Sequence, residues 1–171
     1  MSFLSKLFGG ASADNIPTSA ARVPTGPTID GKCWKRVLVP AIGRPYSVRS
    51  VELACRLARS SSASLHLAYV LEVPRSMVID ASIPDAEALA ASVLQDGEEI
   101  ARQYKVPVIS TVYRTRNAED GVLKLVKEAE CDLLVLGARP DEARGLGREM
   151  TRSLFRQASC EVVLDYIAGE Q

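Results

Sequence analysis

The segment at residues 137–149, GARPDEARGLGRE, combines glycine and arginine in a way that suits binding of a phosphate. Gly137 lets the backbone approach an anion closely, while Arg139 and Arg148 can donate charge-assisted hydrogen bonds to phosphate oxygens. A helix is expected to begin between Arg148 and Thr151, so that its first N–H groups and positive dipole end face the same ligand. These features predict a site that binds a phosphate without a catalytic side chain.

A second candidate loop follows the apolar run RVLVPA and comprises Pro40, Ala41, Ile42, Gly43 and Arg44. The loop that begins at Gly137 follows another apolar run, CDLLVLG. If the two runs are neighbouring strands of a parallel sheet, both loops border one crevice at the carboxyl ends of these strands. The sequence therefore predicts one ligand site made from two distant segments.

The remaining reactive residues do not form a catalytic set. His66, the one histidine of the chain, falls in the middle of a predicted strand, where a packed histidine is expected rather than a general base. The four cysteines show neither a zinc-ligand spacing nor a disulfide framework, and we expect reduced thiols: Cys33, Cys55, Cys131 and Cys160. Asp85 is expected to cap a helix rather than to bind a metal. We therefore expect a protein that is not an enzyme and that holds no metal.

The charge balance argues against a nucleic-acid partner. The chain has 171 residues, with 21 Lys plus Arg against 21 Asp plus Glu, so that no strong overall field attracts DNA or RNA. No stretch is long and apolar enough to form an integral membrane segment. The start, MSFLSKLFGGASA, lacks a basic leader and its apolar run is interrupted by Lys6, which predicts a cytoplasmic protein.

Two regions differ in composition. Residues 1–31 are rich in Ser, Ala, Gly, Pro and Thr without a helical or strand period, and they predict a flexible N-terminal tail. Phe3, Leu4, Leu7 and Phe8 would share one face of a short helix that could touch a partner or a membrane, although so short a helix is marginal alone and a frayed terminus is the favoured interpretation. Residues 32–171 are expected to form one globular domain.

Strands alternate with helices through this domain. Apolar runs predict strands at RVLVPA, LHLAYVLEV, VPVISTVYRT, CDLLVLG and CEVVLDYI. Helical periodicity lies between them, with Val48, Val51, Ala54, Leu57 and Ala58 on one stripe of the first helix. The fourth run is apolar on both faces, which is typical of a buried parallel strand. The pattern predicts an α/β fold with a doubly wound five-stranded parallel sheet and helices on both faces.

On these motifs the chain resembles the universal stress protein family. The resemblance covers about residues 34–167 and rests on KRVLVPAIGRPYSVRSVELACRLA, LAYVLEVP, CDLLVLGARP and SCEVVLDYI. It implies an adenine nucleotide alpha hydrolase-like fold with strand order 3-2-1-4-5, in which the winding reverses between the first and fourth strands. It also implies a homodimer formed through the last strand, Val162 to Ile167.

The resemblance implies an adenine-nucleotide site, but its polar residues are altered. Family members that bind ATP carry an aspartate after the first strand, where this chain has Ile42. They also carry a loop G-x-x-G-x9-G-[ST], in which Gly137 matches the first glycine and Pro140 replaces the second. The closing pair falls on Met150-Thr151 or on Arg148-Glu149, depending on the direction of counting, and neither is Gly-Ser or Gly-Thr. Proline donates no N–H, and a carboxylate at Glu149 would repel a phosphate.

Two interpretations of the function follow. The first is a non-catalytic cytoplasmic regulatory module whose degenerate crevice holds ATP, another adenine nucleotide or another phosphate-bearing ligand, with Val70 against the base. The second is a dimeric interaction module that binds no nucleotide. The segment VLEVPRSMVIDASIPDAE also resembles universal stress domains that accompany amino-acid and cation transporters, which makes such a transporter a candidate partner. A solvated loop of mixed charge explains residues 139–152 as well as an anion site does, because four arginines face three acidic residues there.

Overall fold

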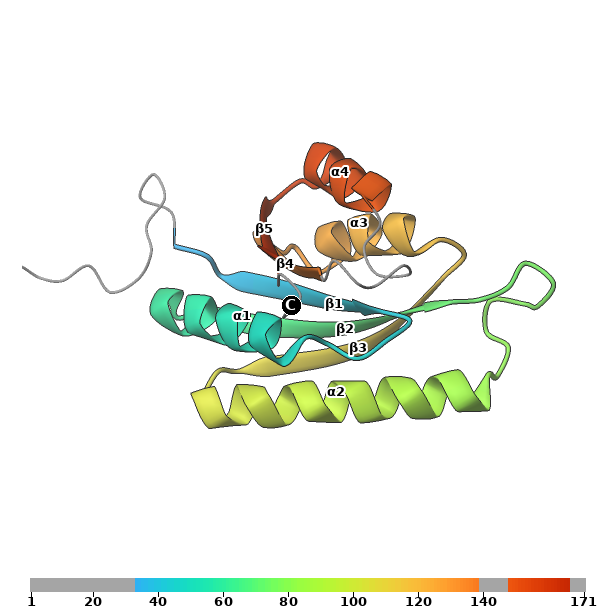
Figure 1. The fold of residues 1–171 in the computed structure, drawn as a ribbon, viewed down its shortest axis with the longest axis horizontal. Helices are drawn as coiled ribbons and strands as arrows, with labels where there is room; N and C mark the ends of the chain where they lie inside the picture. The colour runs from blue at the N-terminus through green and yellow to red at the C-terminus, as the bar shows by residue number, and fades with distance from the viewer. Residues whose placement is uncertain (1–32, 139–147, 167–171) are drawn as a thin grey trace, which may run out of the picture.

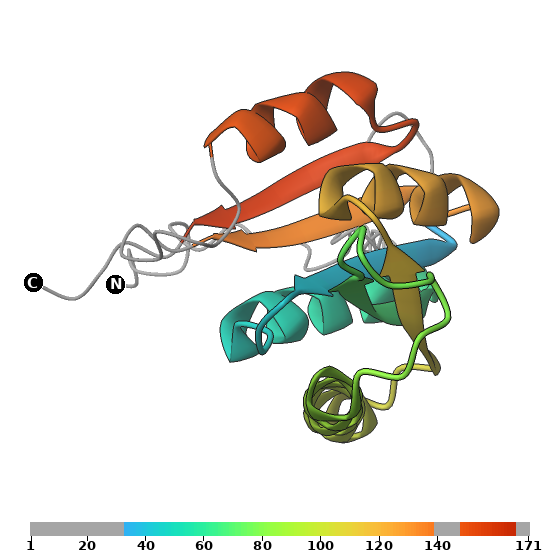
Figure 2. The same cartoon turned by 90° about the vertical axis from the view of Figure 1, so that its right-hand side faces the viewer.

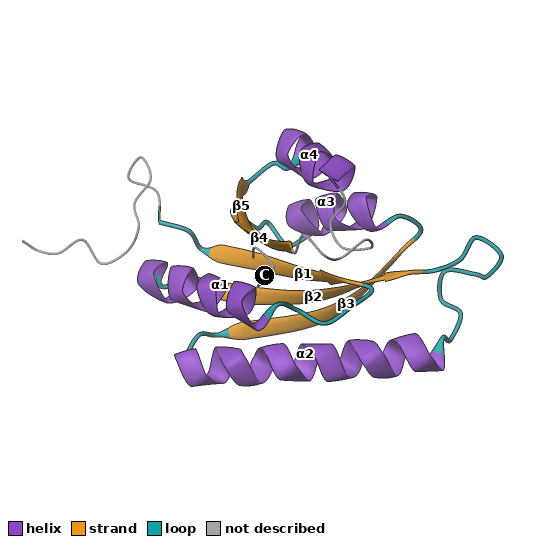
Figure 3. Cartoon of the chain, in the orientation of Figure 1, coloured by secondary structure: helices purple, strands orange, loops and turns teal. Residues whose placement is uncertain are grey.

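The computed structural model describes residues 33–138 and 148–166. Five strands and four helices alternate along this part of the chain (Figure 1, Figure 3). The strands are β1 (Arg36–Ile42), β2 (Ser64–Glu72), β3 (Val108–Thr115), β4 (Leu133–Ala138) and β5 (Glu161–Tyr166). The helices are α1 (Val48–Ser61), α2 (Pro84–Tyr104), α3 (Ala118–Glu128) and α4 (Arg148–Gln157). The predicted tail, with its short apolar segment, lies outside the described residues.

All strand pairs are parallel, and the sheet order is β3-β2-β1-β4-β5. The predicted fold class and strand order are therefore confirmed. Helices α1 and α2 cover one face of the sheet, and α3 and α4 cover the other (Figure 1, Figure 2). No helix in the described ranges is long and apolar enough to cross a membrane.

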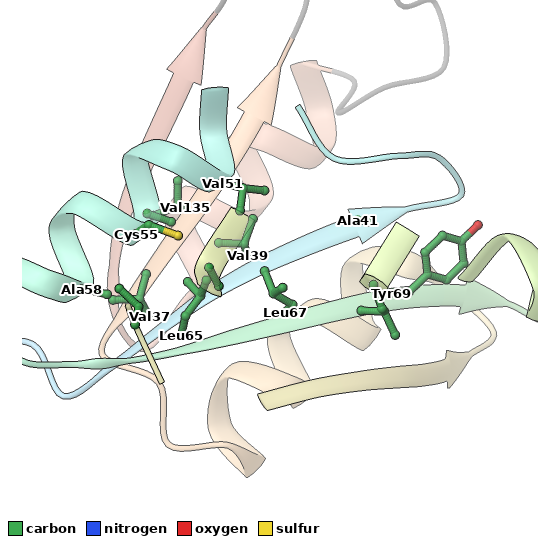
Figure 4. Packing of buried hydrophobic residues seen from close by; sticks show 14 of the residues in the cluster. Val37, Val39, Ala41, Val51, Cys55, Ala58, Leu65, Leu67, Tyr69 and Val135 are labelled. Atoms are coloured by element: carbon green, nitrogen blue, oxygen red, sulfur yellow. The ribbon is translucent and has the colours of Figure 1, made fainter. Parts of the chain in front are cut away.

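Each face of the sheet has its own apolar core. On the α1/α2 side, β1 and β2 contribute alternate residues that pack against Val51, Cys55 and Ala58 of α1 (Figure 4). On the other side, Leu38 and Val70 pack against α3 and against Leu154 of α4. The interior strand β4 supplies both cores with alternate side chains, which explains why its sequence is apolar without interruption.

The start of α2 corrects one prediction. Asp85 is not the N-cap, because Ile83 occupies that position and Pro84 is the first helical residue. Proline suits this place since its missing N–H would have no intrahelical acceptor. Asp85 and Glu87 lie in the first turn, where their charge favours the helix dipole, and Glu87 Oε1 accepts the Ile83 N–H at 3.3 Å.

The apolar stripe of α1 is also narrower than predicted. Val51, Ala54 and Ala58 are fully buried, but Val48 is 59% exposed. The buried face is centred near Val51 and Ala58, and Val48 lies about a quarter turn away from that centre. Ser50 takes a buried position on the other side of the centre, at 1% exposure.

Candidate functional site

The crevice predicted between the first and fourth strands coincides with a fork in the sheet. β1 pairs with β2 along its full length, to Ile42 beside Val70, and β4 pairs with β5 to the end of both strands. β1 and β4, in contrast, pair only at Val37 with Leu133 and at Leu38 with Leu134. The carboxyl halves of β1 and β4 therefore diverge at the place where the winding of the sheet reverses, which is where α/β folds bind ligands.

The β1 side of the fork is formed by the predicted loop. Ala41 is buried in the first core, while Pro40 and Ile42 are half-buried and Ile42 packs against the second core. Gly43 is exposed and has a φ of 65°, a conformation that costs a side chain about 1–2 kcal/mol. Among the described residues, no atom beyond the chain neighbours of Gly43 lies within 4 Å of the position that a Cβ would take there, and its positive φ is the feature that calls for glycine.

Val70 lies beside Ile42 in the sheet register and is 0% exposed. Its side chain belongs to the core between the sheet and α3. The contact predicted between Val70 and a base stays a prediction, and full burial of the side chain gives it no support.

Gly137 is positioned on the β4 side of the fork, against the first turn of α1. A Cβ at this residue would lie 2.5 Å from Ser50 Oγ, 3.2 Å from Ser50 Cβ and 3.4 Å from Ser47 Cβ. The first of these distances is far below van der Waals contact, so that a side chain fits here only if the Ser50 hydroxyl rotates away or if α1 and β4 move apart. Close packing of helix against strand therefore accounts for the glycine without any ligand.

A buried polar pair lies directly beside Gly137. Ser50 Oγ donates a hydrogen bond of 2.8 Å to Asp165 Oδ2, and the Asp165 residue is 8% exposed. The other carboxylate oxygen lies 3.7 Å from Arg49 Nε. Gly137 and Asp165 are also direct partners in the β4–β5 register. The fork thus contains a fixed negative charge that is compensated by a hydroxyl and by one largely exposed guanidinium.

Ser47, the N-cap of α1, presents a further polar group near Gly137. Its Oγ is inaccessible to solvent, yet it has no hydrogen-bond partner among the described residues and does not cap the helix. A buried hydroxyl without a partner costs about 1–3 kcal/mol. This is the kind of group that a bound ligand or water satisfies.

The predicted helix start near Arg148–Thr151 is confirmed, since α4 begins at Arg148. Glu149 lies exposed in the first turn of α4, and Thr151 is half-buried. An acidic side chain at this position already complements the helix dipole that an anion would use. Arg139, Pro140 and the side chain of Arg148 lie outside the described residues, so their predicted roles are not placed in space.

The other chemical candidates lie away from the fork. His66 is the third residue of β2, four positions before Val70, and its Nε2 lies 3.1 Å from Thr111 Oγ1. Burial lowers the pKa of His66, which is expected of a packed histidine. In the part of the chain that the structure describes, no three His, Cys, Asp or Glu residues are grouped so as to hold a metal ion.

The comparison with protein families decides which family this fold represents. The sequence profile of the universal stress protein family matches residues 34–164. The chain belongs to the universal stress protein family. A search of curated proteins gave no match.

Solved universal stress proteins share the fold at low sequence identity. One is a universal stress protein in complex with cAMP, at 20% identity and a TM-score of 0.61, with 79% of this chain and 98% of that chain covered. A second, from Archaeoglobus fulgidus in complex with dAMP, has 14% identity and a TM-score of 0.61 over 78% and 98% of the two chains. A third, from Arabidopsis thaliana with AMP bound, has 18% identity and a TM-score of 0.55 over 77% and 91%.

Sequence reasoning missed the Ser50–Asp165 pair in this family member. The two residues are 115 positions apart, so that no local pattern links them. The available signal was an aspartate inside the apolar run VVLDY and a serine beside the apolar stripe of the first helix. A polar residue in a strand that is expected to be buried calls for a partner, although its position alone does not identify that partner.

Proposed function

We propose that this member of the family is a non-catalytic regulatory domain of the cytoplasm whose fork binds an adenine nucleotide in an altered way. The observation that carries the proposal is the divergence of β1 and β4 at the reversal of the sheet, beside the Ser47 hydroxyl, which has no hydrogen-bond partner among the described residues. Similar solved structures contain cAMP, dAMP or AMP, which supports an adenine ligand. Ala41 to Gly43, Gly137 and the first turn of α4 with Thr151 would border the ligand.

The charges beside the fork favour a ligand with one phosphate over ATP. Asp165 is fixed next to Gly137, and Glu149 occupies the first turn of α4. A phosphate held between Gly137 and the first turn of α4 would be repelled by these two carboxylates, and the repulsion would grow with each added phosphate charge. Arg139 and Arg148 are the cations that we expect to offset them. Among adenine nucleotides we therefore infer a preference for a monophosphate.

Absence of turnover is supported by the chemistry of the described fork residues. Asp165 is the register partner of Gly137, and its carboxylate already accepts a buried hydrogen bond from the Ser50 hydroxyl. His66 is in the amino-terminal half of its strand, with its ring at Thr111. A hydrolase would need a group within hydrogen-bond reach of an attacking water. We infer that the domain acts by binding.

Binding is tested by calorimetric titration of the full chain with AMP, cAMP, ATP and, as a base control, GMP. We expect AMP or cAMP to bind more tightly than ATP, and GMP to bind weakly. Ile42→Asp restores the aspartate of ATP-binding relatives, and one charge-assisted hydrogen bond of about 1.5–3 kcal/mol would raise adenine-nucleotide affinity about 10- to 150-fold. Val78→Asp, at a residue that is 73% exposed in another loop, is the matched control. No binding at millimolar nucleotide by either the parent or Ile42→Asp would refute the proposal.

A second candidate, a dimeric interaction module without nucleotide, is favoured by apolar side chains near the β5 edge. Tyr166 is 59% exposed at the end of β5, and Phe155 is 49% exposed on α4. Within the described sheet, β5 has a strand partner on one side only. Its other edge can therefore pair with a strand of a second copy of the chain. Light scattering at micromolar concentration distinguishes a dimer from the 18.5 kDa monomer. A transporter partner remains a prediction from the sequence.

A further inference from the structure

The opposite end of the sheet contains a cavity that collects most of the thiols of the chain. This cavity, of about 580 Å³, lies where β1, β4 and β5 begin, and Cys33, Cys131 and Cys160 all line it. The sequence separates these three residues by up to 127 positions, and only the fold brings them to one place. Cys55, the fourth cysteine, is fully buried on α1 in the first core.

Cys131 and Cys160 occupy neighbouring places on the same side of the sheet. Leu133 and Glu161 are partners in the β4–β5 register, and Glu161 N donates to Asp132 O at 3.2 Å, which places Cys160 beside Asp132. The two thiols are close enough to act on each other, because the charge of Cys160 is among the causes that raise the pKa of Cys131. A disulfide needs Cα atoms about 4.4–6.8 Å apart, which is the spacing that the proposal requires of this pair. Both side chains pack in the core between the sheet and the pair α3/α4.

The backbone around the two thiols is held by polar contacts. Asp132 accepts hydrogen bonds from the backbone N–H groups of Lys35 at 2.8 Å and Arg36 at 3.0 Å. The Trp34 indole donates to Glu161 Oε2 at 2.9 Å. These bonds fasten the starts of β4 and β5 to the start of β1, so that the two cysteines are presented in a fixed arrangement.

Access to the cavity differs between the thiols. Cys160 is half-buried, whereas Cys131 is 6% exposed. Cys33, which also lines the cavity, is exposed. Of the two thiols that pack in the core, Cys160 is the more accessible, so that a reagent reaches it before Cys131. This order is what a two-step thiol reaction needs: one accessible thiol reacts first and a neighbouring thiol completes the reaction.

We propose that Cys131 and Cys160 form a redox-reactive dithiol that a low-molecular-weight disulfide oxidises to an intramolecular disulfide. The Cys160 thiol loses its proton and attacks the reagent R–S–S–R, forming a Cys160–S–S–R bond and releasing RS⁻, which takes up a proton. Cys131 then loses its proton and attacks the Cys160 sulfur, releasing the second RS⁻. The protein loses two electrons and two protons, and the reagent is reduced to two RSH.

The surroundings make the pair slow to react at neutral pH. Burial raises the pKa of both thiols to about 11. The Asp132 carboxylate acts on both thiols in the same direction, and the Glu161 carboxylate does so on Cys160. The charge of Arg36 lowers the pKa of Cys131. Lys35, a second cation, also lines the cavity. Because the thiolate is the attacking species, the oxidation rate is expected to rise about tenfold per pH unit between pH 7 and 9.

The test is incubation of the reduced full chain with glutathione disulfide at pH 8.5, followed by alkylation of the remaining thiols and non-reducing peptide mapping. We expect a linked Cys131–Cys160 peptide pair in a monomeric species, with the buried Cys55 alkylated and the exposed Cys33 outside any disulfide between protein cysteines. A link that involves Cys33, links between chains only, or four alkylated thiols after exhaustive incubation would each overturn the proposal.

Single substitutions separate the two steps. Cys131→Ser is expected to stop the reaction at a mixed disulfide on Cys160, and Cys160→Ser to leave Cys131 unmodified. Cys55→Ser is the matched control and should leave the Cys131–Cys160 link unchanged, as should Cys33→Ser. A glutathione adduct on Cys131 in the Cys160→Ser protein would contradict the proposed order. The wild-type mapping does not depend on the folding of any variant or on nucleotide binding.

Discussion

Gly137→Ala separates two explanations of the glycine at the end of β4. The structure assigns this glycine to close packing, because an added Cβ would lie 2.5 Å from Ser50 Oγ. A phosphate-binding explanation instead assigns it to the approach of a ligand. The first explanation predicts a loss of stability in the ligand-free protein, and the second predicts a loss of ligand affinity alone.

The expected magnitude follows from the two contacts of Ser50. Overpacking of a rigid contact costs about 1–3 kcal/mol, so that we expect Gly137→Ala to lower the free energy of unfolding by about 2 kcal/mol. Ser50→Ala removes a hydrogen bond to the buried Asp165 carboxylate, which costs about 1.5–3 kcal/mol. The double variant removes the Oγ with which the new Cβ collides, leaving an approach of 3.2 Å to Ser50 Cβ. Its loss is therefore expected to be smaller than the sum of the single losses by about 1–2 kcal/mol.

Urea denaturation of the four ligand-free proteins measures this cycle. Gly43→Ala is the matched control, since no described residue beyond its chain neighbours lies within 4 Å of a Cβ at Gly43, and its φ of 65° opposes a side chain. Its cost of about 1 kcal/mol should add to that of Ser50→Ala without coupling. Gly137→Ala with unchanged stability, or losses that add within error in the double variant, would refute the packing explanation.

Two further predictions concern other parts of the fold. His66 has a lowered pKa in the folded state, so the unfolded chain binds the proton more readily, and stability should fall as the pH drops below the unfolded pKa of about 6.5. His66→Gln should reduce this fall in thermal melts between pH 7 and 5, and an identical pH profile in the variant would count against a buried neutral ring. Arg114 donates to the carbonyl oxygens of Ile79 at 3.2 Å and Ala81 at 2.7 Å, and it pairs with Glu87, which holds the loop between β2 and α2. Arg114→Ala should speed amide hydrogen exchange in residues 78–83 about tenfold or more, whereas Arg75→Ala in the same loop should not; equal effects would show that Arg114 does not hold the loop.

The order and type of the elements could be predicted because each reflects a local pattern. The uninterrupted apolar run of β4 indicates burial on both faces, and the helical period from Pro84 to Tyr104 matches the bounds of α2. The prediction for the cap of α2 is wrong because Asp85 is a good capping residue, yet Pro84 moves the helix start back so that Ile83 holds the N-cap position.

The site is predicted less completely, because its decisive contacts join distant segments. The sequence places Gly137 at the end of the fourth strand, but it does not reveal that Ser50 lies against it. Nor does it indicate that Asp165 is buried in the same contact, or that Cys131 and Cys160 share one cavity. These facts depend on strand register and on how α1 lies on the sheet.

The partial pairing of β1 and β4 has a mechanical consequence. The sheet consists of a three-stranded part, β3-β2-β1, and a two-stranded part, β4-β5, which are paired at two register positions near their amino ends. The Asp132 carboxylate fastens this junction to the backbone of Lys35 and Arg36. The two parts are thus joined beside the thiol cavity and are not paired with each other at Ile42 and Gly137. A small rotation about this junction would move Ile42 and Gly137 through a larger distance than the residues at the junction, so that a ligand held between them would respond to the angle between the two parts of the sheet.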